Sequence, residues 1–526
     1  MPEHFFNHAF VAVYILILLC IALYGFHRYV LVYLYFKHRH DGYVPSRKFT
    51  ELPRITVQLP MYNEDIVAER IIRASCQLDY PLDRLDIQVL DDSTDHSADI
   101  ARRAVEEWAA KGVPIKYIHR TNRVGYKAGA LEAGLSDAKG DFIAIFDADF
   151  VPPRDILRNV VDYFSDGKIG MVQVRWDHLN RDASLLTKSQ AIFLDGHFVI
   201  EHTARNRSGR FMHFNGTAGV WRRSTISDAG GWQHYTLTED LDLSYRAQLK
   251  GWQFVYLPQF CAPAELPPEM IGFKQQAHRW TKGSMQTAIK LLPKILRSKH
   301  LPLRIKSEAF FHLTNTIVYP LMVLLTLMMY PAFIYVDGPL KQYALGHWLF
   351  SGSLFVLATC SASTFFVFGQ RELFGRIAGW KSLLHLPFLM ALGVGVSVNN
   401  AKAVIEAILG AGRRKPSEFI RTPKYGTTGR DRQTWNGAGN GFGATPQSVF
   451  TFKRIMLPIV EIALGGYMSC FIFISLYYHY AISSVPFLCI FAGGYLYVGL
   501  SSMYVLWMMH QEAMDEVEAI DVVEPA

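Results

Sequence analysis

A series of long apolar runs constrains this 526-residue chain more than any other feature of its sequence. Residues 8–36 exceed the roughly 20 apolar residues that a helix needs to cross the hydrocarbon core of a bilayer. No small-residue cleavage site accompanies this run, so we expect a retained helix and not a signal peptide. Four further runs are long enough to span: about 309–335, 347–369, 455–480 and 484–508. The sequence therefore predicts an integral, multi-pass membrane protein with five crossings.

The distribution of Lys and Arg predicts the orientation, because cytoplasmic flanks carry an excess of these residues. They are absent from residues 1–27 and frequent in residues 28–54, which predicts that the N-terminus is outside and that residues of about 40–305 are cytoplasmic. The membrane is expected to be the inner or plasma membrane. The basic segment 411–455 is cytoplasmic by the same rule. The apolar residues 383–410 begin and end on that side, which favours a re-entrant or interfacial helix over another span.

The formal net charge of +7 and the pI near 8.9 do not require a nucleic-acid partner. Juxtamembrane Lys and Arg beside anionic lipid account for most of the excess, and no basic stripe interleaved with aromatic residues is present. We therefore expect the lipid bilayer as a partner and no nucleic acid. The six cysteines follow no metal-ligand spacing, so they are interpreted as packing residues.

Short β-rich runs alternate with helical stretches in the predicted cytoplasmic part. Five of them read as buried strands: 54–60, 86–90, 115–119, 141–146 and 169–174. The segments between them show helical periodicity and glycine stops. This order predicts an α/β fold with a mostly parallel sheet covered on both faces, where ligands bind at the carboxyl ends of the strands.

Acidic residues follow two of these strands. Asp91 and Asp92 can hydrogen-bond a ribose or base, but carboxylates in this position more often cap the next helix. Asp147 and Asp149, in "FDADF", leave an apolar strand on the same side, and such a pair needs a cation beside it. A divalent ion that bridges diphosphate oxygens would stabilise both carboxylates, and a polar turn is the alternative. No glycine-rich phosphate loop accompanies these strands.

Four further residues have both an ordinary and a chemical interpretation. Lys127 is expected at a helix start, where it could meet a phosphate, or it is a surface lysine. Thr238, Glu239 and Asp240 open an amphipathic helix, which suits either a helix cap or a general base. The carboxylate pair upstream favours the catalytic interpretation of these acids, since sugar transfer needs both a base and a stabilised leaving group.

The stretch "QQAHRW" stands shortly before a predicted span. Arg279 offers a planar fork of donors to a diphosphate, Gln276 offers another donor, and Trp280 presents a flat face to a sugar ring. An aromatic and arginine belt at the bilayer surface would explain Arg279 and Trp280 but not Gln276 at that spacing.

Seven motifs in order resemble the family 2 membrane glycosyltransferases of the cellulose synthase superfamily: "LPMYNE", "VLDDSTD", "GYKAGAL", "IFDADF", "FNGTAGVWR", "TEDLDL" and "QQAHRW". The resemblance runs from about residue 54 to 285 and is nearest to the cellulose-synthase-like glucan and glucomannan synthases. "EFIRTPKYG" at 418–426 is similar, more loosely, to the gating loop of those synthases, with Arg421 where an aliphatic residue is usual.

The resemblance implies a GT-A type catalytic domain and a role for each matching residue. The implied donor-binding residues are Tyr62, Glu64, Asp92, Lys127, Asp147, Gln276 and Arg279, and the implied metal ligands are Asp149 and Asp147. Asp240, with Glu239 and Thr238, would be catalytic; Trp280, Asn215 and Gly216 would bind the acceptor; Phe419, Thr422 and Lys424 would belong to the gating-like loop. The implied cofactor is Mg²⁺ or Mn²⁺.

These residues predict an inverting, metal-dependent, processive transferase that makes a β-linked polysaccharide and moves it across the membrane. The preferred donor is UDP-glucose, giving a β-1,4-glucan, and the alternative is GDP-mannose, giving mannan or glucomannan. A non-processive glycolipid transferase and a transporter with a decayed enzyme domain are further alternatives. Expected partners are the nucleotide sugar, the polysaccharide acceptor and accessory secretion proteins.

The predicted organisation places the catalytic domain between transmembrane helices that form an all-α channel. The predicted boundaries are 1–39 for the first transmembrane helix, 40–265 for the cytoplasmic domain, 266–308 for interfacial helices, 309–369 for transmembrane helices, 370–454 for the re-entrant helix and gating-like loop, 455–510 for a transmembrane hairpin and 511–526 for an acidic cytoplasmic tail. Polar residues in the predicted spans, His312, Asn315 and Glu461, suggest a sugar path, although Glu461 could equally pair with Lys453 or Arg454.

Overall fold

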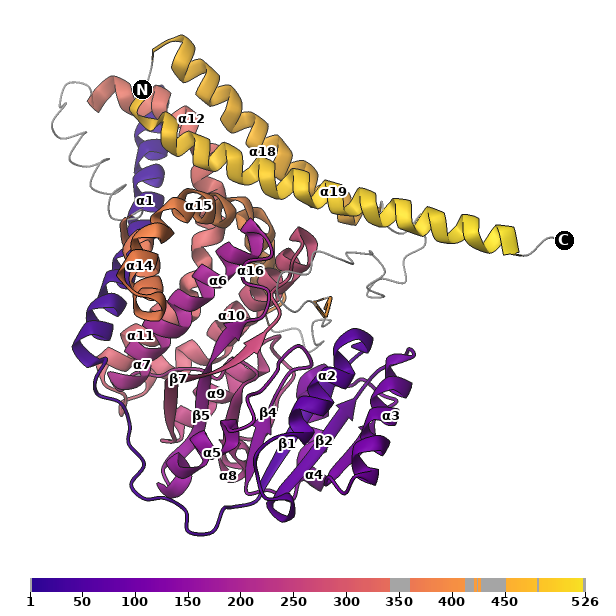
Figure 1. Cartoon of the computed structure of the whole chain (residues 1–526). Helices are drawn as coiled ribbons and strands as arrows, with labels where there is room; N and C mark the ends of the chain where they lie inside the picture. The colour runs from indigo at the N-terminus through magenta and orange to yellow at the C-terminus, as the bar shows by residue number, and fades with distance from the viewer. Residues whose placement is uncertain are drawn as a thin grey trace.

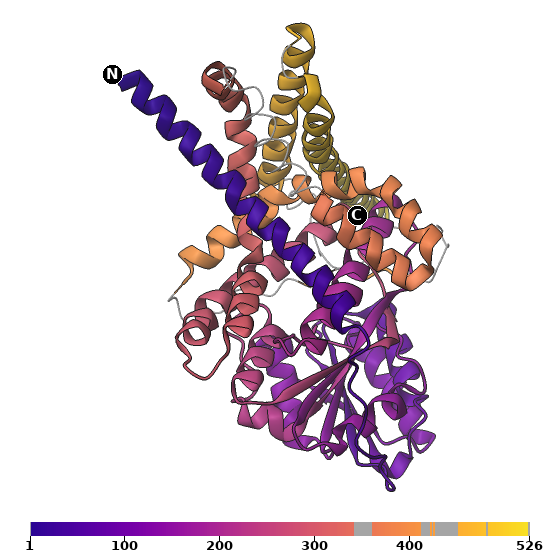
Figure 2. The same cartoon turned by 90° about the vertical axis from the view of Figure 1, so that its left-hand side faces the viewer.

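The structure is a computed structural model that describes residues 2–340, 360–411, 421–422, 424–426, 451–479 and 482–523. An α/β domain forms one end of the molecule, and long helices form the other (Figures 1 and 2). Phe419 of the predicted gating-like loop and most of the predicted span 347–369 lie outside the described residues.

The α/β domain is built on a sheet that, within the described residues, has seven strands in the order β3-β2-β1-β4-β6-β5-β7. Their bounds are β1 (Ile55–Met61), β2 (Leu85–Asp91), β3 (Ile115–His119), β4 (Phe142–Ile145), β5 (Ile169–His178), β6 (Gly219–Arg222) and β7 (Gln253–Ala264). The first four strands are parallel, β6 runs antiparallel between β4 and β5, and β7 is parallel to β5. The predicted mostly parallel α/β sheet is confirmed.

Two of these strands were absent from the sequence prediction. β6 has only four residues, which is too short for a periodic pattern to stand out. β7 contains Pro258 and Pro263, and proline argues against a strand because it cannot donate a backbone hydrogen bond. β7 is last in the sheet order, and an edge strand tolerates proline.

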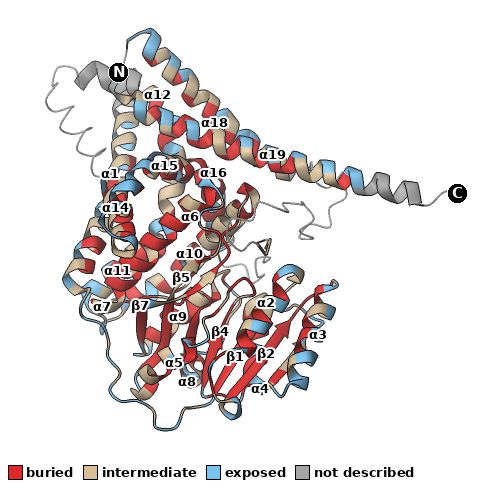
Figure 3. Ribbon diagram, in the orientation of Figure 1, coloured by how far each residue is buried: buried red, intermediate tan, exposed pale blue. Residues whose placement is uncertain are grey.

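Different helices cover the two faces of the sheet. Their bounds are α2 (Asp65–Cys76), α3 (Ser97–Ala110) and α5 (Ile156–Val161) on one face, and α4 (Tyr126–Asp137), α6 (Leu185–Gly196) and α9 (Glu239–Leu249) on the other. In β4, Phe142 and Ala144 pack in the hydrophobic core beneath α2, α3 and α5, whereas Ile143 and Ile145 pack in the core beneath α4, α6 and α9. Successive side chains of a strand point to opposite faces of the sheet. Burial on both faces explains the continuous apolar strands, which Figure 3 shows as buried.

Short elements complete this domain. They are the 3-10 helices η1 (Leu82–Arg84) and η2 (Asp162–Ser165), the π-helix η3 (His197–His202), and the helices α7 (Thr203–Arg207) and α8 (Arg223–Asp228).

The long helices and the short helical segments between them follow the α/β domain, apart from α1 (Pro2–His38), which precedes it. They are α10 (Met270–Arg297), α11 (Leu303–Thr314), η4 (Asn315–Ile317), α12 (Val318–Leu340), a helix at 360–374, α14 (Arg376–Ser382), η6 (Leu383–His385), α15 (Leu386–Gly395), α16 (Ser397–Leu409), α18 (Phe452–Tyr477), η7 (Ile482–Ser484) and α19 (Val485–Val523).

Within the described residues, five helical segments are long and apolar enough to cross a membrane: Ala9–His38, Leu303–Ala332, Arg376–Gly395, Arg454–Tyr477 and Val485–Asp515. Their surfaces carry apolar side chains that face outward, such as Leu16 with 59% and Phe473 with 67% of its surface exposed. Such faces are stable against lipid and unfavourable against water. The chain is therefore a membrane protein.

One of these segments falls where the sequence favours a re-entrant or interfacial helix. Arg376–Gly395 is long enough to span, yet it is divided into α14, η6 and α15. Only its part from residue 383 onward overlaps the predicted region 383–410, which also contains α16. Its path relative to the bilayer stays a prediction.

Helix α10 connects the α/β domain to the long helices. Lys274 forms a buried ion pair with Glu461 of α18, with 2.7 Å between Nζ and Oε1. Lys282 Nζ lies 2.9 Å from Glu406 Oε2 of α16. Glu461 therefore has a partner on α10, whereas the sequence left open a position on a sugar path or pairing with Lys453 or Arg454. His312, in α11, is buried with Nδ1 2.7 Å from the Tyr245 hydroxyl, so it packs against the α/β domain instead of lining a path between helices.

Candidate active site

The parallel strands β1, β2, β3 and β4 bring their carboxyl ends to one edge of the sheet. Met61 is in register with Asp91, and Asp91 with His119. The segments that follow, which contain Tyr62, Asp92 and Arg120, therefore lie side by side. The β4 end adds Asp147 and Asp149, since Gln58 is in register with Ile145.

Asp92 is held by an arginine. Its two oxygens accept hydrogen bonds from Arg120 Nε at 2.7 Å and Nη2 at 2.5 Å, and Asp92 is buried with 4% of its surface exposed. Arg120 also donates to the backbone carbonyls of Val124 and Tyr126. The pair thus fixes the segment that leads into α4.

Tyr62 and Glu64 follow β1. The Arg123 guanidinium stacks on the Tyr62 ring, 3.3 Å from its centroid. Burial raises the pKa of Glu64 to about 8, although Arg421 and Lys424 oppose this shift. Glu64 Oε2 lies 3.5 Å from Arg421 Nη1. Arg421, which stands where an aliphatic residue is usual in the gating loop, is therefore the residue that contacts Glu64.

Each of the two carboxylates of the Asp-x-Asp pair holds a lysine. Lys127 Nζ lies 2.5 Å from Asp147 Oδ1, and Lys424 Nζ lies 2.5 Å from Asp149 Oδ2. Burial lowers the pKa of Lys127, but Asp147, Glu239 and Asp240 raise it above its ordinary value. The two carboxylates therefore stabilise positive charge at this position. Oxygen donors of this type suit Mg²⁺ or Mn²⁺.

Glu239 and Asp240 begin α9, and both lie within the field of Asp147. Burial and the adjacent Glu239 carboxylate raise the pKa of Asp240 to about 7, although Lys127 opposes this shift. In the part of the chain that the structure describes, no Lys, Arg or His nitrogen lies within 4 Å of the Asp240 carboxylate. Asp240 is thus poised to exchange a proton near neutral pH, as a general base must.

Thr238 precedes Glu239 but does not cap the helix with its side chain. Its role is close packing against α10, since a Cβ on Gly283 would lie 2.5 Å from Thr238 Cγ2 and 2.8 Å from Thr238 N. Leu237 N also donates to Gln286 Oε1 at 2.9 Å. Glycine at 283 therefore lets α10 approach the acids directly.

The "QxxRW" residues lie on α10, the same helix that contacts Thr238. Burial lowers the pKa of Arg279, and Glu239, Asp147, Asp240 and Asp149 oppose that shift, so its guanidinium lies within the field of all four carboxylates. Trp280 is partly buried and packs against the core beneath α4, α6 and α9. Gln276 lies one turn before both residues and is partly exposed. The structure therefore brings Arg279 to the acids and carries Gln276 and Trp280 on the same helix.

The segment "FNGT" lies beside Asp240. Gly216 has φ +82°, and a Cβ there would lie 3.0 Å from Asp240 Oδ2 and 3.4 Å from Lys127 Nζ. The Gly216 carbonyl accepts a hydrogen bond from Lys127 Nζ at 2.9 Å. Both the backbone conformation and the space require glycine here.

Asn215 is held by two histidines, with Nδ2 3.3 Å from His197 Nε2 and 3.2 Å from His213 Nε2. Residues five apart point to different sides of a regular α-helix, whereas the π-helix η3 places His197 and His202 together, with 3.0 Å between their Nε2 atoms. Burial lowers the pKa of His202 and His213 well below the ordinary value, so these rings are neutral.

The described part of the gating-like loop lies over the Asp-x-Asp pair. Besides Lys424 at Asp149, Thr422 is buried, and the Tyr425 hydroxyl donates to Glu269 Oε1 at 3.2 Å. Arg70 links the same region, since it pairs with Glu265 at 2.6 Å and donates to the Asp149 carbonyl. These contacts place residues 421–422 and 424–426 against the site.

Several residues of the site were missed by sequence reasoning. Arg120 could have been found from strand register, because it directly follows the strand that pairs with Asp91. Gly283 and Gln286 had only the weak signal of a glycine inside a helical pattern. The meeting of His197 with His202 depends on a π-helix, which sequence periodicity does not reveal.

Known proteins match this chain along most of its length. The family described as "Glycosyltransferase like family 2" matches residues 53–283. Glucomannan 4-beta-mannosyltransferase 1 of Oryza sativa subsp. japonica is 36% identical over 391 residues, which cover 73% of this chain and 71% of that protein. Glucomannan 4-beta-mannosyltransferase 9 of Arabidopsis thaliana is 33% identical over 425 residues, which cover 79% and 74%.

Other matches are shorter. Probable glucomannan 4-beta-mannosyltransferase 4 of Oryza sativa subsp. japonica is 44% identical over 259 residues, and the match spans about half its length, 47%. Among solved structures, the mannosyltransferase PcManGT from Pyrobaculum calidifontis in complex with GDP-Man and Mn²⁺ has a TM-score of 0.52 at 20% identity, covering 76% of this chain and 99% of that one. This likeness concerns the fold and confirms the expected GT-A type.

Proposed function

This chain belongs to the family 2 glycosyltransferases, and we propose that it transfers a hexose from a nucleotide sugar to a growing β-linked polysaccharide. One observation carries the proposal: Asp240, with a pKa near 7, lies beside Gly216 and Lys127, and Lys127 in turn holds Asp147 of the Asp-x-Asp pair. A proton acceptor thus adjoins a group of charges suited to a diphosphate.

The proposed donor is GDP-mannose, and the product is a mannan or glucomannan. The sequence favoured UDP-glucose and kept GDP-mannose as the alternative. The relatives that align with 71% and 74% of their length are named glucomannan 4-beta-mannosyltransferases, which supports the alternative. The donor and linkage are the finest part of the proposal and the part that experiment tests first.

We assign the donor to the carboxyl ends of β1, β2 and β4. Tyr62, Glu64 and Asp92 would face the nucleoside, and Asp147 and Asp149 would hold a divalent cation, Mg²⁺ or Mn²⁺. Such an ion supplies charge neutralisation for the departing diphosphate. Lys127 and Lys424 already place positive charge on these carboxylates, so the donor set fits a cation.

The proposed reaction is an inverting displacement at the anomeric carbon. The Asp240 carboxylate accepts the proton of the acceptor hydroxyl as its oxygen forms the new glycosidic bond. The bond from the anomeric carbon to the nucleoside diphosphate breaks on the opposite face, and the diphosphate leaves with the electron pair. Lys127, Arg279 and Gln276 would bind the charge that develops there, while Trp280, Asn215 and Gly216 would position the acceptor.

We further propose that the α/β domain is cytoplasmic and that the polymer crosses the bilayer beside α10. Two observations support this arrangement. The positive-inside rule assigns residues 28–54 to the cytoplasm, and α10 contacts both the acids, through Thr238, and the long helices, through Lys274. Residues 421–426 would act as a gating loop over the donor.

The test is transfer by purified protein from labelled GDP-mannose or UDP-glucose, each with Mg²⁺, with Mn²⁺ or with EDTA. We expect pelletable polymer from GDP-mannose that a β-1,4-mannanase digests, and no product with EDTA. Asp149→Ala should abolish metal-dependent donor binding. Product from UDP-glucose alone would overturn the donor assignment, and a single glycolipid product would overturn the polymerase assignment.

A further inference from the structure

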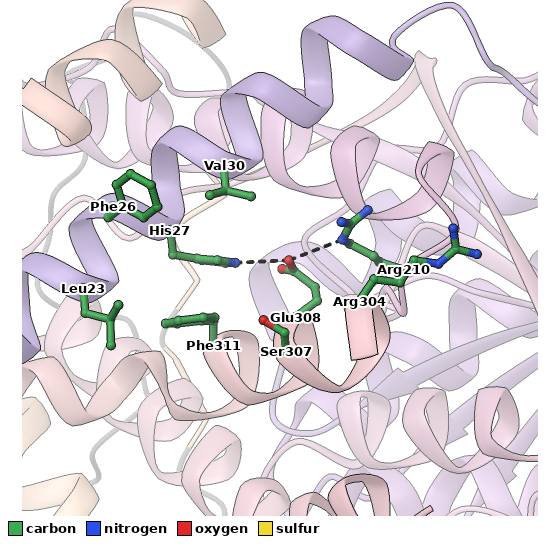
Figure 4. Close-up of a pocket in the computed structure, with 9 residues that line it drawn as sticks. All are labelled: Leu23, Phe26, His27, Val30, Arg210, Arg304, Ser307, Glu308 and Phe311. Carbon is green, nitrogen blue, oxygen red and sulfur yellow. Dashed lines mark hydrogen bonds and ion pairs between the residues drawn. The ribbon is translucent and has the colours of Figure 1, made fainter. Parts of the chain in front are cut away.

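A cavity of about 280 Å³ lies between α1 and α11, away from the Asp-x-Asp pair (Figure 4). The residues that line it are Leu23, Phe26, His27, Val30, Arg210, Arg304, Ser307, Glu308 and Phe311. Both helices belong to candidate membrane spans, Ala9–His38 and Leu303–Ala332. Arg210 comes from the α/β domain, so the cavity lies where that domain meets the membrane helices.

One part of the lining is apolar and open to the surroundings. Leu23 and Phe26 on α1 have 50% and 52% of their surfaces exposed, although they lie in a candidate span. Val30 and Phe311 continue this wall toward the polar residues (Figure 4). A hydrocarbon chain is the partner that such a wall favours.

The other part of the lining carries excess positive charge. The acid in the cavity, Glu308, is already engaged: Arg205 Nε lies 2.9 Å from its Oε1, and His27 Nε2 lies 3.1 Å from its Oε2. Arg210 Nε is 3.9 Å from Glu308, a long contact. Among the described residues, no carboxylate oxygen lies within 4 Å of Arg304.

The two arginines also stand close enough to repel each other. Burial lowers the pKa of Arg210 from its ordinary value, Glu308 opposes that shift, and Arg304 lowers the pKa further. Two neighbouring guanidinium groups, of which only Arg210 has a carboxylate within 4 Å and that at 3.9 Å, are stabilised by an added anion. Guanidinium forks also match phosphate oxygens in geometry.

We propose that this cavity binds a membrane phospholipid, with its phosphate on Arg304 and Arg210 and an acyl chain along Leu23, Phe26 and Phe311. The combination of an anion site with an open apolar wall in one cavity separates this ligand from a soluble phosphate and from a neutral lipid. Basic sites between helices at the cytoplasmic surface are known to recognise lipid head groups. The bound lipid would tie α1 to the α/β domain through Arg210.

The test measures lipid retention by the full-length protein in detergent, using native mass spectrometry with added phosphatidylglycerol. Arg304→Gln and Arg210→Gln should each weaken retention roughly 10–100-fold, the effect of losing a hydrogen bond to a charged group. Lys306→Gln is the matched control, because it removes one positive charge from α11 without touching the cavity. Thermal unfolding of each variant without lipid checks that the fold is retained.

Three results would overturn the proposal. Equal retention by the wild type, Arg304→Gln and Arg210→Gln would show that the arginines do not hold the phosphate. If the protein retained diacylglycerol as well as it retains phosphatidylglycerol, the cavity would be an apolar groove without an anion site. Complete displacement of phosphatidylglycerol by millimolar inorganic phosphate would show a site for free phosphate.

Discussion

Asp92 and Asp240 are two carboxylates with opposite surroundings. Asp92 follows β2 and receives two hydrogen bonds from Arg120, at 2.7 and 2.5 Å. Asp240 opens α9 beside another acid, and burial together with Glu239 raises its pKa to about 7. Asp92 is thus held in place by a guanidinium, whereas among the described residues no Lys, Arg or His nitrogen lies within 4 Å of the Asp240 carboxylate, whose pKa lies near neutral pH. The nearest charge therefore distinguishes the two acids, in line with the proposed donor-binding role of Asp92 and the proposed catalytic role of Asp240.

This contrast extends to the two halves of the site. The proposed donor half contains ion pairs, Asp149 with Lys424 and Asp92 with Arg120. The acceptor half contains Glu239 and Asp240 with a glycine and a helix packed against them. Four predictions test the contrast, from the largest expected effect to the smallest.

Asp240→Asn should remove most turnover and leave donor binding intact. A general base typically contributes about 100–10,000-fold, and the amide cannot accept the proton. Turnover and donor affinity, the latter from titration calorimetry with GDP-mannose, are the two measurements. Asp92→Asn serves as the comparison and should weaken donor binding more than turnover. If Asp240→Asn kept turnover within about threefold of the wild type, Asp240 would not be the base.

Arg279→Lys should lower turnover by roughly 10–100-fold, although the positive charge is kept. Lysine lacks the planar fork that binds two diphosphate oxygens, and this interaction strengthens as the leaving group gains charge. The measurement is kcat and KM separately. A change in KM alone would assign Arg279 to ground-state binding of the donor.

Gly216→Ala should lower turnover by about tenfold beyond its effect on stability. A Cβ at this position would crowd Asp240 and Lys127, and alanine at positive φ costs about 1–2 kcal/mol. Gly112→Ala is the matched control, because Gly112 has a similar φ of +83° with no atom within 4 Å of the new Cβ. Equal turnover of the two variants would mean that backbone strain, not crowding of the site, is responsible.

The pH dependence should show the raised pKa of Asp240 in both activity and stability. Turnover should rise with pH up to about 7, because the base must be deprotonated. The folded state holds the proton more tightly than the unfolded chain, where an Asp has a pKa of 3.8, so this residue's stabilising contribution is full below that value. It is lost as the pH rises toward 7.

Thermal unfolding of Asp240→Asn tests the same shift. At pH 8 the variant avoids the free-energy cost of ionising the buried Asp240 carboxyl. If that cost is about 1 kcal/mol, the variant should unfold roughly 1 °C above the wild type, because the unfolding entropy grows with the length of the 526-residue chain. The difference should shrink as the pH falls toward 4. A difference that did not vary with pH would assign the effect to packing and not to ionisation.

The sequence anticipated the parallel strands because they are buried on both faces and therefore read as continuous apolar runs. Asp147 and Asp149 stood out as charges at the end of such a run. β6 and β7 did not, since one is short and the other contains proline. Arg120, Gly283 and His197 were missed because their importance comes from a neighbour distant in the sequence.

Residue order alone determined the apolar spans, the strands with their acidic ends, and the seven motifs that resemble the family, because these properties are local and repeat with the period of a helix or strand. Only the tertiary structure decided which acid contacts Arg120 and which acid has a pKa near 7. It also brought Lys424 to Asp149, although 275 residues separate them in the sequence. A side chain's charge depends on burial and on the nearest opposite charge, and both are set by packing between segments far apart in the chain.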